Sequence, residues 1–383
     1  MAKVSLPPVL LIKQYERISA NEGLSMEQLM SLHRWVSAAL PKLTAEGIFM
    51  PSDSSTQALV LLPLTGDAGF RQYYRVNTSP ECLLVRGPKQ PGKSESGAHF
   101  ADLSSVLHQH GVPTPLIYAC DIDNNYLLIE SFGGTDLLDV LSADTVEAYY
   151  SLAQSTLIKL QQVDQLKDCL PVYDNAMLLQ ELALFPEWFV ETMLGHELSS
   201  AERSMFDQLA SFLSQRAAEQ PQVVVHRDYH SRNIMYRDSG ELGVIDFQDA
   251  VYGPITYDLA SLLKDCYVRW PPEDVQRWAM DYMKMAIKAG VMPEVSSQQF
   301  VQWFDLMGLQ RHIKVLGIFA RLSLRDGKNR YLSDLPLVMR YTLETAQKYP
   351  HTQAFAQWFE RVLLPMIMLQ PWYHDHNIAG DVR

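Results

Sequence analysis

The first third of the chain alternates between apolar and polar residues in short runs. Runs rich in β-branched and aromatic side chains, bounded by turn-forming residues, are typical of β-strands. Five such runs occupy residues 58–64, 70–76, 82–86, 116–120 and 126–130. A helical pattern at 94–110 separates the third run from the fourth, and Ser25 with Gln28 makes a capping-box sequence for a helix through Leu40. The pattern predicts a five-stranded antiparallel sheet with one inserted helix.

After Phe132 the spacing of apolar residues becomes mostly helical. The clearest case lies in residues 305–325, where a core stripe steps by three and four through Leu306, Leu309, Ile313, Leu316, Ala320 and Leu324. A second face of the same segment carries Arg311, Lys314, Arg321 and Arg325. This basic stripe is either an anion-binding face or a solvated surface, and both interpretations stay open. A sheet followed by helices predicts an α+β fold with a second, mostly helical lobe.

One stretch, residues 223–249, breaks the helical pattern. Its valine run predicts a short buried strand that leads into His226-Arg227-Asp228, and two further strand-like segments flank an Asp-Ser-Gly turn. Asn233 opens the first strand of this hairpin, and Asp246 follows the second. We expect the hairpin to hold Asp228, Asn233 and Asp246 near one point.

The order and spacing of these three residues match the phosphoryl-transfer signature of kinases. Asp228 can accept a hydrogen bond from an attacking hydroxyl and orient it toward the γ-phosphate. Asn233 and Asp246 offer the oxygen ligands that Mg²⁺ prefers beside nucleotide phosphates. The alternative is a buried hairpin in which Asp and Asn only satisfy turns, and it needs three coincident spacings. We therefore expect ATP and Mg²⁺ as cofactors and Asp228 as the catalytic residue.

The motif departs from that of protein kinases after Asp246. Gln248 replaces the glycine of Asp-Phe-Gly, and the interval to Asp258 is too short for a long activation loop, so a small-molecule acceptor is expected. The segments HRDYHSRN, IDFQDA and GPITYDLASLL resemble the aminoglycoside phosphotransferase family. The resemblance implies a protein-kinase-like two-lobed fold, Asp228 as catalytic base, and Asn233 and Asp246 as magnesium ligands. It also implies that Asp258 is a buried brace of the catalytic loop.

Three longer segments resemble one subgroup of this family. Residues 181–190, 245–271 and 305–336 are similar to the bacterial anomeric sugar kinases of cell-wall recycling. That likeness implies a sugar 1-kinase that phosphorylates the anomeric hydroxyl of N-acetylmuramate and N-acetylglucosamine. The organisation we expect is an N-terminal extension at 1–25, a nucleotide-binding N-lobe at 26–131, a helical C-lobe with the catalytic hairpin and acceptor site at 132–350, and a C-terminal tail at 351–383.

The candidate nucleotide contacts lie in the expected N-lobe. The loop Gly66–Gly69 can cover phosphates with backbone amides, although an ordinary hairpin turn explains it as well. The third strand has no lysine, so Arg71 or Arg86 is the candidate for the phosphates. Glu95 is the candidate partner of Arg86, the alternatives being a solvated pair or an acidic first helical turn. The backbone from Glu130 to Phe132 is the expected adenine hinge.

A second nucleotide motif competes with this assignment. Residues Gly87 to Ser94 satisfy the P-loop pattern between a predicted strand and a predicted helix. However, Pro88 and Pro91 have no amide hydrogen, and a P-loop binds phosphate through its amides. We therefore expect the P-loop match to be fortuitous.

The acceptor site should lie in the helical lobe beside the catalytic residue. Glu187 and Asp249 are candidates for sugar hydroxyls, and Glu187 can equally be a surface residue. Arg311 and Lys314 are candidates for an anionic group such as a lactyl carboxylate. The basic stripe argues against the alternative of an aminoglycoside or amino-alcohol (choline-like) kinase, whose acceptor is cationic. The intact motif argues against a nucleotide-binding pseudokinase, although the missing lysine favours one.

Composition and net charge indicate which classes of binding partner to expect. A net charge of −12 disfavours nucleic acid or an anionic membrane, and 47% hydrophobic residues allow a sizeable core. The four cysteines are widely spaced without a metal-binding pattern, which favours reduced, buried thiols in the cytoplasm. The apolar run at 9–12 is too short to span a membrane. We expect a cytoplasmic monomer whose partner is a small-molecule amino sugar.

Overall fold

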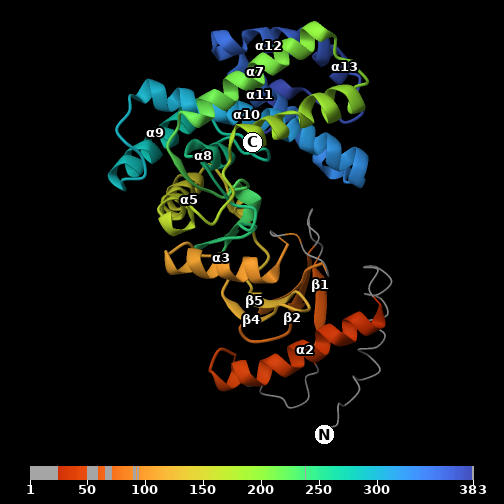
Figure 1. The fold of residues 1–383 in the computed structure, drawn as a ribbon, viewed down its shortest axis with the longest axis vertical. Coiled ribbons are helices and arrows are strands. Elements are labelled where there is room, and N and C mark those ends of the chain that lie inside the picture. The colour runs from red at the N-terminus through yellow and green to blue at the C-terminus, as the bar shows by residue number, and fades with distance from the viewer. Residues whose placement is uncertain are drawn as a thin grey trace. The chain divides into compact units, whose positions relative to one another are not determined.

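The computed structural model describes residues 25–49, 59–64, 71–88, 92, 95–237 and 239–381 (Figure 1). The chain divides into two compact units. The N-terminal unit holds the residues up to Gln109 together with Pro113–Gly134 and Gly243–Gln248. The helical unit holds His110–Val112, Thr135–Leu242 and the residues from Asp249 onward. The 243–248 segment therefore belongs to the first unit, although the residues on both sides of it belong to the second.

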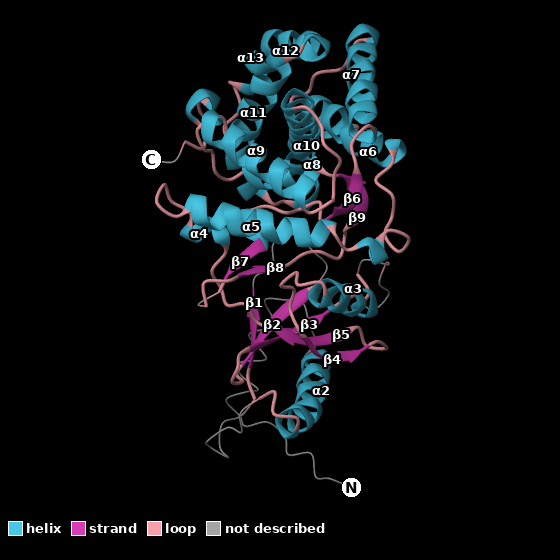
Figure 2. Ribbon diagram, turned by 90° about the vertical axis from the view of Figure 1, so that its left-hand side faces the viewer, coloured by secondary structure: helices cyan, strands magenta, loops and turns pink. Residues whose placement is uncertain are grey.

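A five-stranded antiparallel sheet forms the centre of the N-terminal unit (Figure 2). Its spatial order is β1-β2-β3-β5-β4. The strands are β1 (Leu61–Leu64), β2 (Gln72–Val76), β3 (Cys82–Arg86), β4 (Ile117–Asp121) and β5 (Tyr126–Glu130). The third and fifth coincide with the predicted runs, the second and fourth lie within two residues of them, and the first begins three residues later than predicted. The prediction of an α+β fold with this sheet is confirmed.

Helices α2 (Met26–Ala45) and α3 (Gly97–Gln109) lie on opposite sides of the sheet (Figures 1 and 2). Ser25 and Gln28 form the predicted capping box at the start of α2. The buried face of α2 packs against the sheet, and the shared core contains Leu29, Leu32, Val36, Tyr74, Val76, Leu84 and Leu128. Burial of this apolar stripe, more than helix propensity, fixes α2 on the sheet.

The segment 243–248 is tied to the N-terminal unit by close packing. A Cβ atom on Gly243 would lie 2.4 Å from the ring of Phe132, so only glycine allows this approach. The Val244 amide donates to the Pro113 carbonyl at 2.8 Å. The Phe247 ring lies 4.8 Å from the ring of Phe100 on α3, centroid to centroid. These contacts place the backbone of Asp246 on the N-terminal unit.

The helical unit consists mainly of helices, with a few short strands. The helices are α4 (Leu137–Val140), α5 (Val146–Gln161), α6 (Asn175–Leu182), α7 (Ser200–Ala218), α8 (Thr256–Leu263), α9 (Pro272–Lys288), α10 (Ser297–Asp326), α11 (Leu335–Lys348), α12 (Gln353–Trp358) and α13 (Leu364–Ile367). The strands β6 (Gln222–Val225) and β9 (Val251–Pro254) pair antiparallel. Strand β7 (Ile234–Tyr236) pairs with β8 (Leu242–Val244), whose last two residues begin the segment 243–248 of the N-terminal unit. None of the helices described is long and apolar enough to cross a membrane.

Helix α10 is the central element of the helical unit. It packs against α8, α11 and the π-helical turn η2 (Phe185–Met193). The predicted core stripe is buried except at one position: Leu306, Leu309, Ile313, Leu316 and Ala320 are at most 2% exposed. Leu324 is 48% exposed, so that part of the prediction is wrong. The last turn of α10 extends beyond the core. Gly327, which adopts a left-handed conformation, then ends the helix.

Residues beyond 350 are packed into the core of the helical unit. Phe355 and Phe359 from α12 and the turn after it surround Phe185, and Leu363 and Ile367 are fully buried in the same cluster. The C-terminal helices therefore complete the cluster on which η2 rests.

Gly317 is the closest backbone contact of α10. A Cβ atom there would lie 2.4 Å from the backbone of Leu184, whereas at Gly308 in the same helix it would meet only the flexible side chain of Lys264 at 3.3 Å. We expect Gly317→Ala to lower the free energy of unfolding by roughly 1–3 kcal/mol because the backbones must separate. Gly308→Ala is the matched control and should be neutral within about 1 kcal/mol, since alanine favours the helix. Urea unfolding of both variants tests this, and equal stability of the two would contradict the packing.

Candidate functional site

The candidate catalytic loop follows β6, and hydrogen bonds to its backbone hold it in a sharp turn. Val223, Val224 and Val225 are buried in β6, and the chain then turns sharply, with Arg227 in the left-handed region at φ 76°. The Asp258 carboxylate accepts hydrogen bonds from the backbone amides of His226 at 2.6 Å and Arg227 at 3.0 Å. Two charge-assisted bonds to one carboxylate hold a conformation that a non-glycine residue rarely adopts. The predicted bracing role of Asp258 is confirmed.

Asp258 is itself completely buried within α8. Burial raises the pKa of its carboxyl group to about 6, against the opposing effect of the His226 charge and of the two amide bonds. At neutral pH the group is therefore mostly ionised and able to accept both bonds.

A second carboxylate holds the far end of the loop. Asp265 Oδ2 accepts from the Ser231 amide at 2.9 Å, in the short 3-10 helix η3 (Ser231–Asn233). Asn233 therefore closes this turn and does not open the following strand as the sequence predicted. Its Nδ2 donates to the Asp228 carbonyl at 3.0 Å. Because the nitrogen is used in this way, Oδ1 is the atom through which Asn233 can ligate a metal.

Asp228 lies half-buried among positive charges. Burial raises the pKa of its carboxyl group, but Lys314, His230 and Arg227 outweigh that effect and hold the pKa below its ordinary value. The carboxylate is thus ionised at neutral pH and can accept a hydrogen bond from a substrate hydroxyl.

A buried ionic cluster surrounds this loop. Glu181 of α6 pairs with the guanidinium of Arg227 and with Lys314 Nζ, the latter at 3.1 Å. It also accepts a hydrogen bond from Tyr173, while Lys314 donates to Tyr257 Oη at 2.9 Å. Burial raises the pKa of Glu181, but the charges of Lys314 and Arg227 prevail and lower it. The cluster fixes the side chain that precedes Asp228.

Sequence reasoning missed Glu181 and selected Glu187 from the same segment. Glu187 is exposed on η2, whereas Glu181 is 8% exposed. The signal was present in the helical spacing, because Leu178, Glu181 and Leu182 share the buried face of α6.

The predicted basic stripe on α10 divides into two parts. Arg311 is 3% exposed and donates to Cys266 Sγ at 3.3 Å, and Lys314 is 6% exposed within the ionic cluster. Arg325 is exposed and pairs with Asp326 at 2.7 Å. The solvated-surface interpretation is therefore wrong for Arg311 and Lys314, which reach inward and place positive charge near Asp228.

Asp246 sits among residues of the N-terminal unit. It is exposed, adopts φ 64°, and accepts at Oδ1 from Gln248 Nε2 at 2.6 Å. Burial raises the pKa of Tyr73, the Arg71 charge lowers it, and the Asp246 charge raises it, so these three groups are close together. Within this unit, therefore, a candidate metal ligand and a candidate phosphate-binding arginine are neighbours.

The other candidate nucleotide residues make mainly local contacts. Arg86 donates to Gln72, and Glu95 Oε2 accepts from the Gly92 amide at 2.9 Å, so each has a partner other than the one expected. Glu130 Oε2 accepts from the Leu116 amide at 3.2 Å. Gly69 lies outside the described residues, as do Lys93 and most of the P-loop-like turn.

Asp249 begins the return of the chain to the helical unit. Its side chain is exposed, and its carbonyl accepts from Arg227 Nη1 at 3.5 Å. Asp249 is thus anchored beside the catalytic loop by its backbone, with its carboxylate exposed.

Cysteine and histidine form no metal centre in the part of the chain that the structure describes. Cys82 and Cys266 are buried, and Cys120 and Cys169 are exposed free thiols, so the expectation of buried thiols is correct for two of the four.

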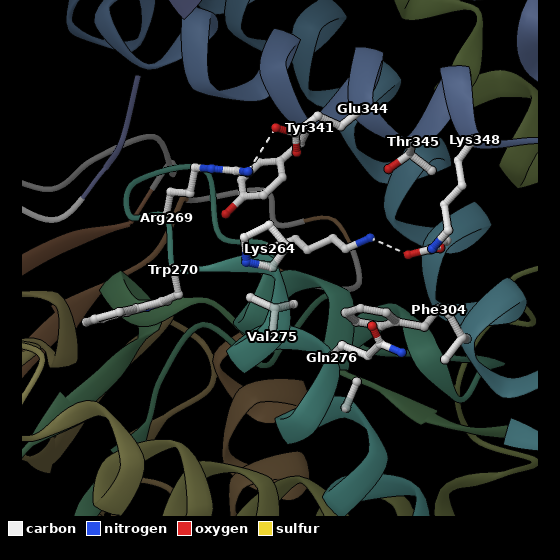
Figure 3. A pocket seen from close by; sticks show the side chains of 14 residues that line it. Lys264, Arg269, Trp270, Val275, Gln276, Phe304, Tyr341, Glu344, Thr345 and Lys348 are labelled. Carbon is white, nitrogen blue, oxygen red and sulfur yellow. Dashed lines mark hydrogen bonds and ion pairs between the residues drawn. The ribbon is translucent and has the colours of Figure 1, made fainter. Parts of the chain in front are cut away.

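A cavity of about 290 Å³ opens elsewhere in the helical unit (Figure 3). Lys264 pairs with Asp305 and Arg269 with Glu344 along its wall, both at 2.8 Å. Its charged groups therefore have protein partners, and no predicted site residue lines it.

The ionic cluster gives the first test of the site. Glu181→Gln leaves Arg227 and Lys314 without their buried carboxylate, and breaking such a pair costs roughly 3–5 kcal/mol. We expect a lower melting temperature and at least a tenfold loss of kcat. Glu197→Gln, at an exposed glutamate in the loop before α7, should change neither quantity. Adding Lys314→Met to Glu181→Gln should recover stability, because it removes one unpaired charge. Unchanged melting and turnover in Glu181→Gln would contradict this role.

Comparisons with known proteins agree with this architecture. The model of the phosphotransferase enzyme family matches residues 60–294. An N-acetylmuramate/N-acetylglucosamine kinase of Pseudomonas aeruginosa is 40% identical over 320 residues, which cover 83% of this chain and 92% of that protein. The Neisseria meningitidis protein of the same name is 34% identical over 328 residues, covering 85% and 92%.

Solved structures share the fold at low sequence identity. An ethanolamine kinase of Plasmodium vivax superposes with a TM-score of 0.57 at 13% identity, covering 92% of this chain and 98% of that one. An ADP-bound aminoglycoside phosphotransferase superposes with a TM-score of 0.52 at 14% identity, covering 80% and 98%. The likeness confirms the protein-kinase-like fold. With the family model matching more than half of its length, this chain belongs to the phosphotransferase enzyme family.

Proposed function

We propose that this protein transfers the γ-phosphate of ATP to the anomeric hydroxyl of N-acetylmuramate and of N-acetylglucosamine. The observation that carries the proposal is the catalytic loop, on which Asp258 and Asp265 fix the backbone around an ionised Asp228. The two relatives at 34–40% identity bear the name of this activity and are covered over nearly their whole length.

Asp228 acts as the base in this proposal. Phosphoryl transfer depends mainly on positioning and electrostatics, so the loop must hold the carboxylate in line with the attacking oxygen. A C1 hydroxyl is more acidic than an ordinary sugar alcohol, and a carboxylate with a low pKa can still accept its proton as the bond to phosphorus forms. The lowered pKa of Asp228 suits this substrate better than a simple alcohol.

The donor set fits a magnesium ion. We propose that Asn233 Oδ1 and the Asp246 carboxylate are the two protein ligands, since Mg²⁺ takes hard oxygen donors and keeps several waters. The motif spacing supports their acting together. When bound, the ion would neutralise charge on the nucleotide phosphates. The chain's own contribution is to orient the two oxygens, through the Asn233 bond to Asp228 and the Gln248 bond to Asp246.

ATP is the proposed phosphate donor. Arg71 is the better supported of the two candidate arginines, because its charge and that of the candidate metal ligand Asp246 both act on Tyr73. Arg86, Glu95, the Gly69 loop and the backbone from Glu130 to Phe132 remain proposed contacts of phosphate or adenine.

The charge around the base bears on the choice of acceptor. Lys314, Arg227 and Arg311 all place positive charge near Asp228, which disfavours the cationic aminoglycosides and amino alcohols. We propose that Arg311 and Lys314 act on the acceptor through this field, and that Asp249 and Glu187 offer carboxylates for its hydroxyls.

Removing the base tests the chemistry. Asp228→Ala should lower kcat by roughly three or more orders of magnitude, since positioning and general-base action are lost together. ATP affinity, measured by calorimetry, should stay within a few-fold of wild type. Asp207→Ala removes an exposed aspartate on α7 and is the matched control for folding and activity. Near wild-type turnover of Asp228→Ala would show that the base has been misassigned.

Product analysis tests the acceptor. We expect phosphorus NMR of reactions with ATP, Mg²⁺ and either amino sugar to show a phosphate signal coupled to the anomeric proton. Kanamycin and choline, supplied as alternative acceptors, should give no phosphorylated product. A 6-phosphate, or phosphorylation of the cationic acceptors alone, would overturn the proposed function.

A further inference from the structure

Arg232 is a cation on the catalytic loop that the motif assignment does not use. It is the middle residue of η3, between Ser231 and Asn233, and its side chain is half-buried. Its guanidinium carbon lies 3.6 Å from the centroid of the Tyr267 ring. Such stacking fixes the plane of the guanidinium and leaves its N–H donors at the edge, where a carboxylate can bind them.

The ion pairs around the loop distinguish Arg232 from its neighbours. Arg227 and Lys314 each pair with Glu181, and Arg269 pairs with Glu344. In the parts of the chain described here, no carboxylate oxygen lies within 4.0 Å of a nitrogen of Arg232. The N–H donors of this half-buried guanidinium are thus not used by an ion pair within the described residues, and a bound carboxylate could accept from them.

Carboxyl groups approach Arg232 without contacting it. Burial raises the pKa of Asp334 to about 6, and the Arg232 charge acts against that rise. The pKa of Asp136 is also raised, mainly by burial, and the charge of Arg232 again acts to lower it. Asp265 is bonded to the Ser231 and Tyr267 amides and is not free to turn toward Arg232. The two carboxyl groups on which the Arg232 charge acts, Asp334 and Asp136, thus make no ion pair with it among the described residues.

The loop gives Arg232 a fixed position relative to the base. The Ser231 amide is held by Asp265, and the Asn233 side chain is bonded to the Asp228 carbonyl. His230 packs edge-on against the same Tyr267 ring, with centroids 5.4 Å apart. The backbone bonds that fix the turn carrying Asp228 therefore also fix the residue from which the Arg232 side chain leaves, as recognition of a second feature of the acceptor requires.

The buried cations of α10 are poor candidates for direct contact with the acceptor. Lys314 is bonded to Glu181 and Tyr257, and Arg311 to Cys266, and both are at most 6% exposed. Both cations have polar partners inside the protein, whereas among the described residues Arg232 has no ion-pair partner.

We propose that Arg232 binds the lactyl carboxylate of N-acetylmuramate and thereby sets the preference for the anionic sugar over N-acetylglucosamine. The inference rests on the proposed function, because it concerns the acceptor of that reaction. Tyr267 acts as the platform that orients the guanidinium. N-acetylglucosamine has no carboxylate and binds without using this residue.

The test compares kcat/KM for the two sugars in Arg232→Gln and Arg232→Lys. Loss of a charge-assisted pair should lower kcat/KM for N-acetylmuramate roughly ten- to a hundredfold in Arg232→Gln, mainly through KM. The value for N-acetylglucosamine should stay within about threefold. Arg232→Lys should fall between, since lysine keeps the charge and loses the planar fork. Arg325→Gln, an exposed arginine paired with Asp326, is the matched control and should affect neither sugar.

A neutral substrate provides a test that does not depend on the stability of a variant. The lactamide analogue of N-acetylmuramate has the same shape without the charge. Wild type should lose roughly ten- to a hundredfold in kcat/KM on going from the acid to the amide, and Arg232→Gln should treat acid and amide alike. Equal turnover of acid and amide by wild type overturns the proposal. So does an equal loss for both sugars in Arg232→Gln, which would indicate a structural role.

The same data separate this inference from the proposed function. If wild type phosphorylates both sugars and the acid–amide difference is absent, only the role of Arg232 is lost. If wild type phosphorylates neither sugar, the proposed function itself fails and the role of Arg232 fails with it.

Discussion

The site depends on one carboxylate that accepts two backbone hydrogen bonds. Asp258, buried in α8, binds the amides of His226 and Arg227 and so fixes the point at which the chain leaves β6. Without those bonds Arg227 would have little reason to keep a left-handed backbone, because that conformation is unfavourable for residues with a Cβ atom. With the backbone fixed, Arg227 pairs with Glu181, and the position of the next residue, the proposed base Asp228, is fixed as well.

The charge that surrounds Asp228 is opposite in sign to the net charge of the whole protein. The chain carries a net charge of −12, yet Arg227, Arg311 and Lys314 gather positive charge around Asp228. Glu181 supplies the counter-charge that makes burial of two of these cations tolerable. The Asp228 carboxylate therefore stays ionised. We propose that the positive charge around it favours neutral or anionic sugars, and that direct recognition of an anion involves Arg232, which has no carboxylate within salt-bridge distance in the described part of the chain.

Hydrophobic patterning predicted the fold well because strand and helix periods are local properties. The five strands, the capping box at Ser25 and most of the α10 stripe follow from such patterns. Patterning left open whether Arg311 and Lys314 point inward or into solvent, because their partners are not local in the sequence. Glu181, the partner of Lys314, lies far away along the chain and is brought near by the packing of α6 against α10. The stacking of Arg232 on Tyr267 is non-local in the same way.

The central claim is that the C1 oxygen of the sugar attacks the γ-phosphorus of ATP. The most direct measurement follows that oxygen, with N-acetylmuramate labelled with ¹⁸O at the anomeric hydroxyl as the acceptor. We expect the ³¹P signal of the sugar phosphate to show the isotope shift of a directly bonded ¹⁸O, and this product to be lost in Asp228→Ala. A product phosphate without the label, or ADP released with no sugar phosphate formed, would contradict the account.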